Sequence, residues 1–267
     1  MSSVELIPGA STPKEPPEVD GVSWGNAHCF WAFPCLVLPV SEPWYYWKSG
    51  PLEPALNMAV DEILLEDGGH QGAPLFRSYE WSLPAASFGY SQRWEEVATW
   101  TALRPLVRRC TGGGLVPHDA DWTYAVVVPA GHAWWRLRAS ESYCRLHEWL
   151  RRAFGHLQVQ TELAPVPDPT GPGRCFIGAE ESDLLHGGRK IAGAAQRRNR
   201  NGLLIQGSVQ PPPKGCDRAS WEEAMQQTAS TAWGIAWHPW EPDVEWRMRA
   251  ERLAAEKYRD IGYLHRR

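Results

Sequence analysis

The spacing of hydrophobic positions changes along the chain between the period of a helix and the period of a strand. Apolar residues recur at helical spacing over residues 54–66, which predicts an amphipathic helix there. The same pattern predicts further helices over residues 95–102, 139–154, 221–233 and 242–258. Short apolar, aromatic or β-branched runs predict strands over residues 44–47, 75–79, 85–90, 106–109, 122–128, 183–185, 190–194 and 203–209.

The order of these elements predicts the fold class. Strands and helices are mixed, without the steady strand–helix–strand alternation of a doubly wound parallel sheet. We therefore expect an α+β fold with a mixed β-sheet and flanking helices. The uninterrupted apolar run over residues 122–128 suits a central strand. His186, Gly187 and Gly188 separate two short strands, which predicts a hairpin at that point.

The first part of the chain has a different composition. Residues 1–42 are rich in Pro, Ser and Gly, which resist helix formation, so we expect a mostly irregular tail there. An extended arm over residues 29–40 that packs on the domain would keep its aromatic side chains out of water. The catalytic domain is expected over residues 43–267.

Composition and charge exclude several classes of function. The formal net charge is −4, with 31 acidic and 27 basic residues, so no global positive field predicts binding to nucleic acid or to an anionic membrane. The six cysteines form no C-x-x-C pair, and no metal site is predicted. The N-terminal residues lack the features of a secretory leader, and no segment reaches the roughly 20 apolar residues of a spanning helix. We expect a soluble cytoplasmic enzyme with reduced thiols.

The most informative run is RRCTGGGLVPHD, from Arg108 to Asp119. Its three glycines, 112–114, let the main chain approach a ligand without Cβ interference, and their N–H groups can hold an oxyanion. Arg109 precedes them, and His118 with Asp119 adds a polar clamp. A glycine-rich hairpin with solvated arginines would explain the glycines but not the whole run. No Gly-Lys-Ser/Thr ends it, which excludes a phosphate-binding P-loop, and it is not a dinucleotide-binding fingerprint either.

A second cluster, GRKIAGAAQ, places a lysine among small residues. We expect Lys190 to point into a pocket and to bind an acyl carbonyl or carboxylate at its mouth. Gly193 and Ala194 are too small to fill a sheet face, so they leave room for a slender apolar chain. A surface lysine in a hairpin is the alternative.

Cys175 is the candidate nucleophile. It follows Arg174 and lies near further cations in the sequence, which favours the thiolate that attacks thioesters. Cys110, inside the glycine-rich run, is the rival. The chain has no G-x-S-x-G elbow, and its histidines form no metal-binding pair on a helix, so a hydrogen-bonding role is expected for His118.

Four segments in order resemble the superfamily of lipoate-protein ligases and octanoyltransferases, which is related in fold to biotin-protein ligases. They are LNMAVDE at 56–62, SFGYSQ at 87–92, the run 108–119, and GRKIAGAAQ at 188–196. The resemblance covers about residues 44–258. It implies a class II synthetase-like catalytic domain in which a mixed sheet encloses a narrow pocket for an eight-carbon acyl chain.

The resemblance leaves two activities. Ligases activate lipoate as an adenylate with ATP and Mg²⁺, whereas octanoyltransferases pass an octanoyl group from acyl carrier protein through a cysteine thioester. Cys175, followed by Asp183 and Lys190, resembles the cysteine-dependent transferases, which need no cofactor. Ligases commonly have Asn-Asp where this chain has Ser182-Asp183, and few residues follow Tyr258 that could form their accessory domain.

On this resemblance Cys175 and Lys190 are catalytic, and the acyl acceptor is a lysine of a lipoyl domain, either of a 2-oxoacid dehydrogenase or of the glycine cleavage H protein. A non-catalytic acyl- or lipoyl-domain-binding module on the same scaffold is the remaining alternative. The expected substrate-binding residues are Arg77, Arg109, Gly112, Gly113, Gly114, Val116, His118, Asp183, Gly193 and Ala194.

Overall fold

The computed structural model describes residues 41–167 and 178–266. The chain divides into two units, Met1–Leu38 and Pro39–Arg267, and the described residues all belong to the second. The first strand begins at Glu42. The predicted irregular tail, up to residue 40, and its aromatic arm lie outside the described residues, as does Cys175.

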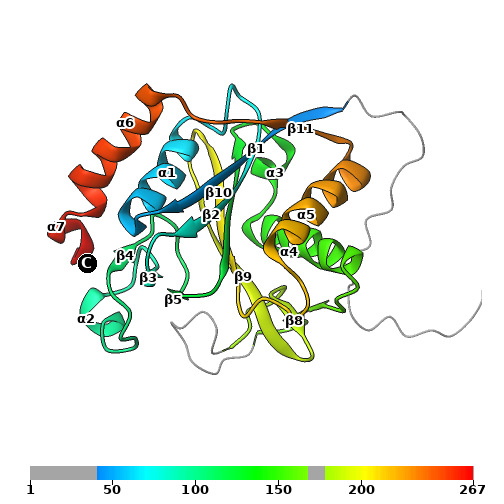
Figure 1. The fold of residues 1–267 in the computed structure, drawn as a ribbon, viewed down its shortest axis with the longest axis horizontal. Coiled ribbons are helices and arrows are strands. Elements are labelled where there is room, and N and C mark those ends of the chain that lie inside the picture. The colour runs from blue at the N-terminus through cyan, green and yellow to red at the C-terminus, as the bar shows by residue number, and fades with distance from the viewer. Residues whose placement is uncertain (1–40, 168–177, 267) are drawn as a thin grey trace, which may run out of the picture. The chain divides into compact units, whose positions relative to one another are not determined.

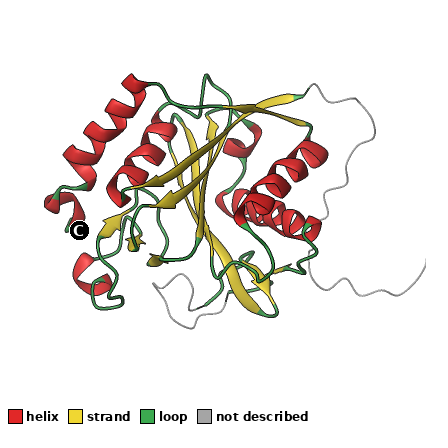
Figure 2. Ribbon diagram, in the orientation of Figure 1, coloured by secondary structure: helices red, strands yellow, loops and turns green. Residues whose placement is uncertain are grey.

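An eight-stranded mixed sheet forms the centre of the second unit (Figures 1 and 2). β1 is parallel to both of its neighbours, β11 and β2, whereas the remaining pairs are antiparallel. The mixed sheet with flanking helices confirms the predicted α+β class. In spatial order the strands are β11 (Ile235–Pro239), β1 (Glu42–Leu52), β2 (Leu75–Trp81), β6 (Trp122–Pro129), β10 (Gly202–Val209), β9 (Arg189–Arg198), β8 (Leu184–His186) and β7 (Glu162–Leu163).

A second sheet of three short strands carries the glycine-rich run. β3 (Ala85–Phe88) is parallel to β4 (Leu106–Arg108) and antiparallel to β5 (Val116–His118). The glycines therefore lie in the turn that connects the two outer strands. The run from Arg108 to Asp119 therefore lies next to β3, where Ser87 pairs with Val116 of β5.

Helices cover both faces of the main sheet (Figure 1). One face is covered by α1 (Pro54–Glu66), with α6 (Val244–Leu253) and the wider-turned η1 (Ala254–Tyr258) packed against α1. The other face is covered by α4 (Ala139–His156) and α5 (Arg218–Trp233), which also contact each other. Two short helices, α2 (Trp94–Val97) and α3 (Ala133–Arg136), lie in connections, and a third, α7 (Ile261–Leu264), follows η1 as the last element.

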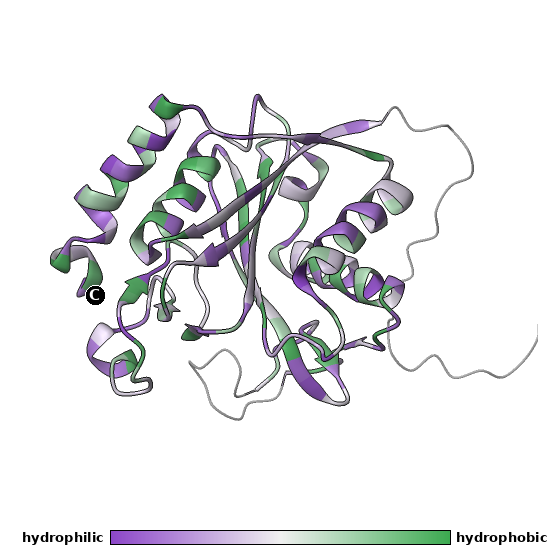
Figure 3. Cartoon of the chain, viewed as in Figure 1, coloured by the Kyte–Doolittle hydropathy of each residue, from purple (hydrophilic) through white to green (hydrophobic). Residues whose placement is uncertain are grey.

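The apolar run of β6 is explained by its position between these helical layers. Tyr124 and Val126 enter the core beneath α4 and α5, whereas Ala125 and Val127 enter the core beneath α1. Side chains that alternate across a strand are here buried on both faces, so the predicted central strand is confirmed. α1 is likewise covered on two sides, because it lies between the sheet and α6, and Figure 3 shows that it is largely hydrophobic.

The predicted helices and strands are all present, with some changes of length. The helix predicted over residues 95–102 ends at Val97, and beyond that end Arg104 donates hydrogen bonds to the carbonyls of Ala98 and Thr101. The predicted hairpin is formed by β8 and β9, and both Gly187 and Gly188 have the positive φ that its turn requires. None of the helices within the described residues is long and apolar enough to cross a membrane.

Candidate active site

A cavity lies between the main sheet and the small sheet that carries the glycine-rich run. The volume it encloses is about 30 Å³, and the empty space between its lining atoms, open solvent at the mouth included, is about 380 Å³. Its walls lie close together, which favours a slender ligand over a bulky one. The lining residues are Met58, Tyr79, Trp81, Ser87, Arg109, Gly113, Val116, His118, Thr123, Gly193, Ala194, Ala195, Gln206, Gly207 and Ser208.

The cavity exists because the adjacent strands β9 and β10 carry small residues where they face each other. Gly193 pairs with Ser208, and Ala194 pairs with Gly207. A Cβ on Gly207 would lie 2.2 Å from the ring of Tyr124, so only glycine fits between that ring and the cavity. Gly193 and Ala194, which were predicted to leave room for a slender apolar chain, lie in the cavity wall.

Arg109 shapes the glycine-rich turn from inside. Its Nη2 donates to the carbonyl oxygens of Gly112 and Gly114, at 3.1 and 2.7 Å, and its Nη1 donates to Ser87 Oγ at 2.7 Å. Gly113, with φ of +82°, turns toward the cavity between these carbonyls. Of the three glycines, Gly113 alone is among the described residues that line the cavity, and Gly112 and Gly114 are half-buried on either side of it.

His118 is held by partners on both ring nitrogens. Nε2 lies 2.7 Å from Ser87 Oγ, and Nδ1 lies 2.9 Å from Asp121 Oδ2. Trp81 stacks on the imidazole at a centroid distance of 3.9 Å, which places His118 in the cavity wall beneath an aromatic ring. The prediction of a hydrogen-bonding role agrees with this geometry. The clamp residue is different, however, because Asp121, and not Asp119, pairs with the ring.

Asp121 is an ionised carboxylate in a buried site. Burial alone would raise its pKa, but the neighbouring His118 and hydrogen bonds from His118, Ser208 and Thr123 outweigh burial and hold the pKa below its ordinary value. The hydroxyls of Ser208 and Thr123 donate to Asp121 Oδ2 at 2.6 and 2.8 Å. Asp121 was not among the residues predicted from the sequence. The available signal was a carboxylate three positions after His118.

Lys190 is inside the protein, which rules out the surface-lysine alternative. Its Nζ lies 2.6 Å from Asp183 Oδ2, and the two side chains are 6% and 0% exposed. Asp183 also accepts hydrogen bonds from the hydroxyl of Tyr143, on α4, and from the Glu180 N–H. A Cβ on Gly193 would lie 2.7 Å from Lys190 Cε, so the absence of a side chain at Gly193 leaves the space that the lysine occupies.

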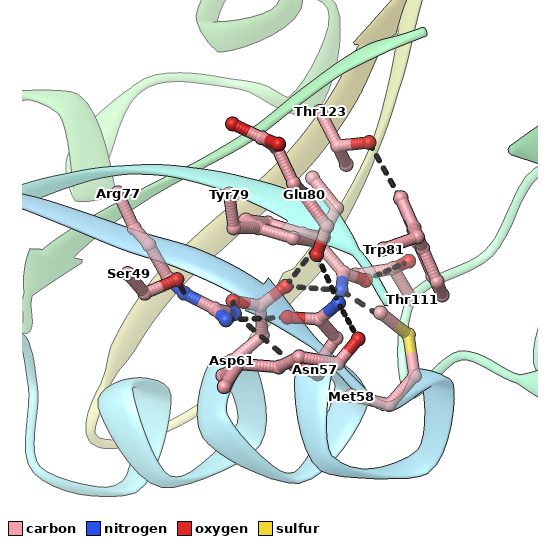
Figure 4. Close-up of polar contacts among 12 residues, drawn as sticks. Ser49, Asn57, Met58, Asp61, Arg77, Tyr79, Glu80, Trp81, Thr111 and Thr123 are labelled. Carbon is pink, nitrogen blue, oxygen red and sulfur yellow. Dashed lines mark hydrogen bonds and ion pairs between the residues drawn. The ribbon is translucent and has the colours of Figure 1, made fainter. Parts of the chain in front are cut away.

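Arg77 does not line the cavity, which corrects its predicted contact with substrate. It is fully buried, and its Nη1 lies 2.5 Å from Asp61 Oδ1 while its Nη2 donates to Asn57 Oδ1 at 2.6 Å (Figure 4). Asp61 Oδ2 in turn accepts hydrogen bonds from Tyr79 and from Gln206, both of which line the cavity. Arg77 therefore anchors α1 to the sheet behind the cavity wall, where its donors serve protein acceptors.

Of the two candidate nucleophiles, the structure describes Cys110. Burial, together with the nearby carboxylate of Glu62, raises the pKa of the Cys110 thiol to about 12, so it is protonated at neutral pH. Cys110 also lies in the core beneath α1 and is absent from the described cavity lining. Both features argue against Cys110 as the nucleophile, while Cys175 lies outside the described residues and stays a prediction.

Comparison with known proteins agrees with these features. The family model "Lipoyl protein ligase A/B catalytic domain" matches residues 53–210, more than half of the chain. Octanoyltransferase LipM from Oceanobacillus iheyensis is 34% identical over 176 residues, which cover 63% of this chain and 64% of that protein. The chain thus spans just under two thirds of the length of this relative.

Solved structures share the fold at lower identity. A lipoate-protein ligase A bound with ATP superposes with a TM-score of 0.68 and 16% identity, over 85% of this chain and 99% of that chain. A putative lipoate protein ligase from T. acidophilum with bound lipoic acid gives a TM-score of 0.67 and 17% identity, over 84% and 98%. The glycine-rich turn, the lysine strand and the family match lead to one conclusion: the chain belongs to the lipoyl protein ligase A/B catalytic domain family.

Proposed function

We propose that this protein is an octanoyltransferase, which moves an octanoyl group from acyl carrier protein to a lysine of a lipoyl domain through a thioester on Cys175. The observation that carries the proposal is the 34% identity to an octanoyltransferase over a stretch of 176 residues. A second support is the narrow cavity, whose wall of small residues suits an unbranched acyl chain.

In the proposed reaction the acyl chain enters the cavity with its carbonyl near Gly193, beside Lys190. The Cys175 thiolate attacks the carbonyl carbon, a new C–S bond forms, and the thiolate of the carrier protein leaves. The ammonium group of Lys190, oriented by Asp183, stabilises the negative charge that develops on the carbonyl oxygen. The neutral amine of the acceptor lysine then attacks the enzyme thioester, the C–N bond of the amide forms as the C–S bond breaks, and the departing Cys175 thiolate takes up the proton that the amine loses.

The remaining predicted residues have supporting positions. Arg109 fixes the turn through the carbonyls of Gly112 and Gly114, and Val116 and Ala194 contact the acyl chain in the cavity. Tyr143 holds Asp183 against Lys190. The site is therefore built to hold and polarise an acyl group before the acceptor arrives.

The acyl donor and the acyl acceptor are part of the same proposal. The acyl donor is octanoyl acyl carrier protein, and the acceptor is a lipoyl domain of a 2-oxoacid dehydrogenase or the glycine cleavage H protein, all in the cytoplasm. The transfer exchanges one acyl bond for another, so the proposed reaction uses neither ATP nor Mg²⁺.

The decisive assay measures octanoylation of a purified lipoyl domain by mass spectrometry, with octanoyl acyl carrier protein as donor and no ATP. We expect modification by the wild type and by the Cys110→Ala variant, and loss of modification in Cys175→Ala. Modification that requires free lipoate and ATP, and that persists in Cys175→Ala, would instead establish an ATP-dependent lipoate-protein ligase.

A further inference from the structure

Three side chains in and behind the cavity wall have the geometry of a nucleophile, a general base and an orienting carboxylate. Ser87 Oγ lies 2.7 Å from His118 Nε2, and His118 Nδ1 lies 2.9 Å from Asp121 Oδ2. All three are nearly inaccessible to bulk solvent, and the serine and the histidine line the same cavity. Hydrogen bonds from serine to histidine and from histidine to carboxylate, beside a cavity, are the arrangement by which serine acyltransferases and hydrolases activate a hydroxyl.

The direction of the hydrogen bonds supports this assignment. The guanidinium group of Arg109 has donors only, so Ser87 Oγ accepts the bond from Arg109 Nη1 at 2.7 Å. With a neutral imidazole, the hydroxyl proton of Ser87 is then available to His118 Nε2. The proton on Nδ1 is donated to Asp121, whose pKa is held low enough for a carboxylate at neutral pH. This is the protonation state in which His118 acts as a base.

The surroundings also favour a reactive serine. Arg109 places a positive charge beside Ser87 Oγ, which stabilises the developing alkoxide and the negative charge of a tetrahedral intermediate. Trp81 covers one face of the imidazole at 3.9 Å, which keeps water from competing for the ring. The proposed transfer through Cys175 assigns none of these groups a covalent role.

We propose that Ser87, His118 and Asp121 form a second acyl-transfer centre, which takes the acyl group of medium-chain thioesters or activated esters onto Ser87 and hydrolyses it. Ser87 Oγ attacks the carbonyl carbon as His118 takes its proton. The new C–O bond forms, the bond to the leaving thiolate or alkoxide breaks, and the leaving group receives the proton. Water then attacks the serine ester as His118 takes a proton from it, the C–O bond to Ser87 breaks, the fatty acid leaves, and Ser87 recovers a proton from His118.

The test uses the full chain in a Cys175→Ala background with p-nitrophenyl octanoate as the probe. Neither carrier protein nor lipoyl domain is present, so the result does not depend on the proposed octanoyl transfer. We expect steady release of p-nitrophenolate and an octanoyl group on the peptide that contains Ser87. Adding Ser87→Ala or His118→Gln should lower the rate by about 10²- to 10⁴-fold, the usual contribution of general acid–base catalysis.

Matched variants separate chemistry from folding. Ser140→Ala changes an exposed serine at the start of α4 and should leave the rate unchanged. Ser87→Cys keeps the size of the side chain, and it should carry the octanoyl group as a thioester that neutral hydroxylamine cleaves. The proposal is overturned if Ser87→Ala, with the melting temperature of its parent, hydrolyses the probe at the parent's rate. It is also overturned if residue 87 carries no octanoyl group in either the serine or the cysteine form.

Discussion

Replacing Arg77 by methionine removes the cation from a fully buried ion pair. In the wild type the guanidinium group contacts Asp61 at 2.5 Å, Asn57 at 2.6 Å and Ser49 Oγ at 3.1 Å. Methionine has no donor for any of these acceptors. The carboxylate of Asp61 would keep its hydrogen bonds from Tyr79 and Gln206 but would lose its opposite charge.

The magnitude follows from burial, because both side chains of the pair are 0% exposed. Removing one partner of a buried pair costs about 3–5 kcal/mol, since the other charge is left uncompensated. For a domain of this size, 1 kcal/mol shifts the melting temperature by about 2–4 °C, so we expect Arg77→Met to lower it by roughly 6–20 °C. The same loss should appear in urea unfolding as a lower midpoint with an unchanged slope.

The matched control is Arg259→Met, which removes a partly exposed arginine paired with Glu53 and Glu251. An exposed pair of this kind contributes about 0–1 kcal/mol, so this variant should melt within a few degrees of the wild type. Adding Asp61→Asn to Arg77→Met removes the stranded charge and should recover part of the loss. If Arg77→Met is as stable as Arg259→Met but fails to bind an octanoyl substrate, Arg77 contacts the substrate and the structural role is wrong.

Three further changes test residues in and behind the cavity wall. Gly207→Ala places a Cβ 2.2 Å from the Tyr124 ring, and overpacking of this kind should cost about 1–3 kcal/mol in thermal unfolding; an unchanged melting temperature would contradict it. Gly193→Ala crowds the flexible end of Lys190, so we expect lower transfer activity at nearly unchanged stability, and equal activity would argue against a role for Lys190 in the reaction. The pKa of Asp121 is lower in the folded protein than in the unfolded chain. Its carboxylate therefore stabilises the fold at a pH above its pKa in the unfolded chain. This stabilisation is lost as the pH falls through its pKa in the folded protein. Asp121→Asn should therefore be destabilising at pH 7 and progressively less so as pH falls below about 4 in urea unfolding, and a loss that does not change with pH would refute the assignment.

The parts of the fold that local pattern determines were predictable from the sequence. α1 begins at Pro54 and ends at Glu66 as predicted, because its apolar face is continuous and proline suits the first turn. β11 was missed, since five residues of mixed polarity become a strand only by pairing in parallel with β1, almost 200 positions away. β5, at three residues, is likewise defined by its pairing with β3 rather than by its own periodicity.

In the candidate site, too, some residues were predictable from the local sequence and others depended on the fold. The glycine-rich run and the lysine strand were found because several unusual residues are adjacent in the sequence, and the structure places both at one cavity. The partner of His118 was misjudged, because the chain turns after β5 and brings Asp121 back to the ring instead of its neighbour Asp119. Arg77 was misjudged because burial and a partner on α1 depend on how that helix docks.

The central claim, an acyl group carried on Cys175, is tested most directly by trapping the intermediate. The wild-type chain is mixed with octanoyl acyl carrier protein, without a lipoyl domain or ATP, and the octanoyl group is located by peptide mass spectrometry. We predict a hydroxylamine-sensitive octanoyl group on Cys175 that disappears when a lipoyl domain is added, as the acceptor lysine becomes modified. An unmodified Cys175, in a protein that nevertheless octanoylates the lipoyl domain, would contradict the account.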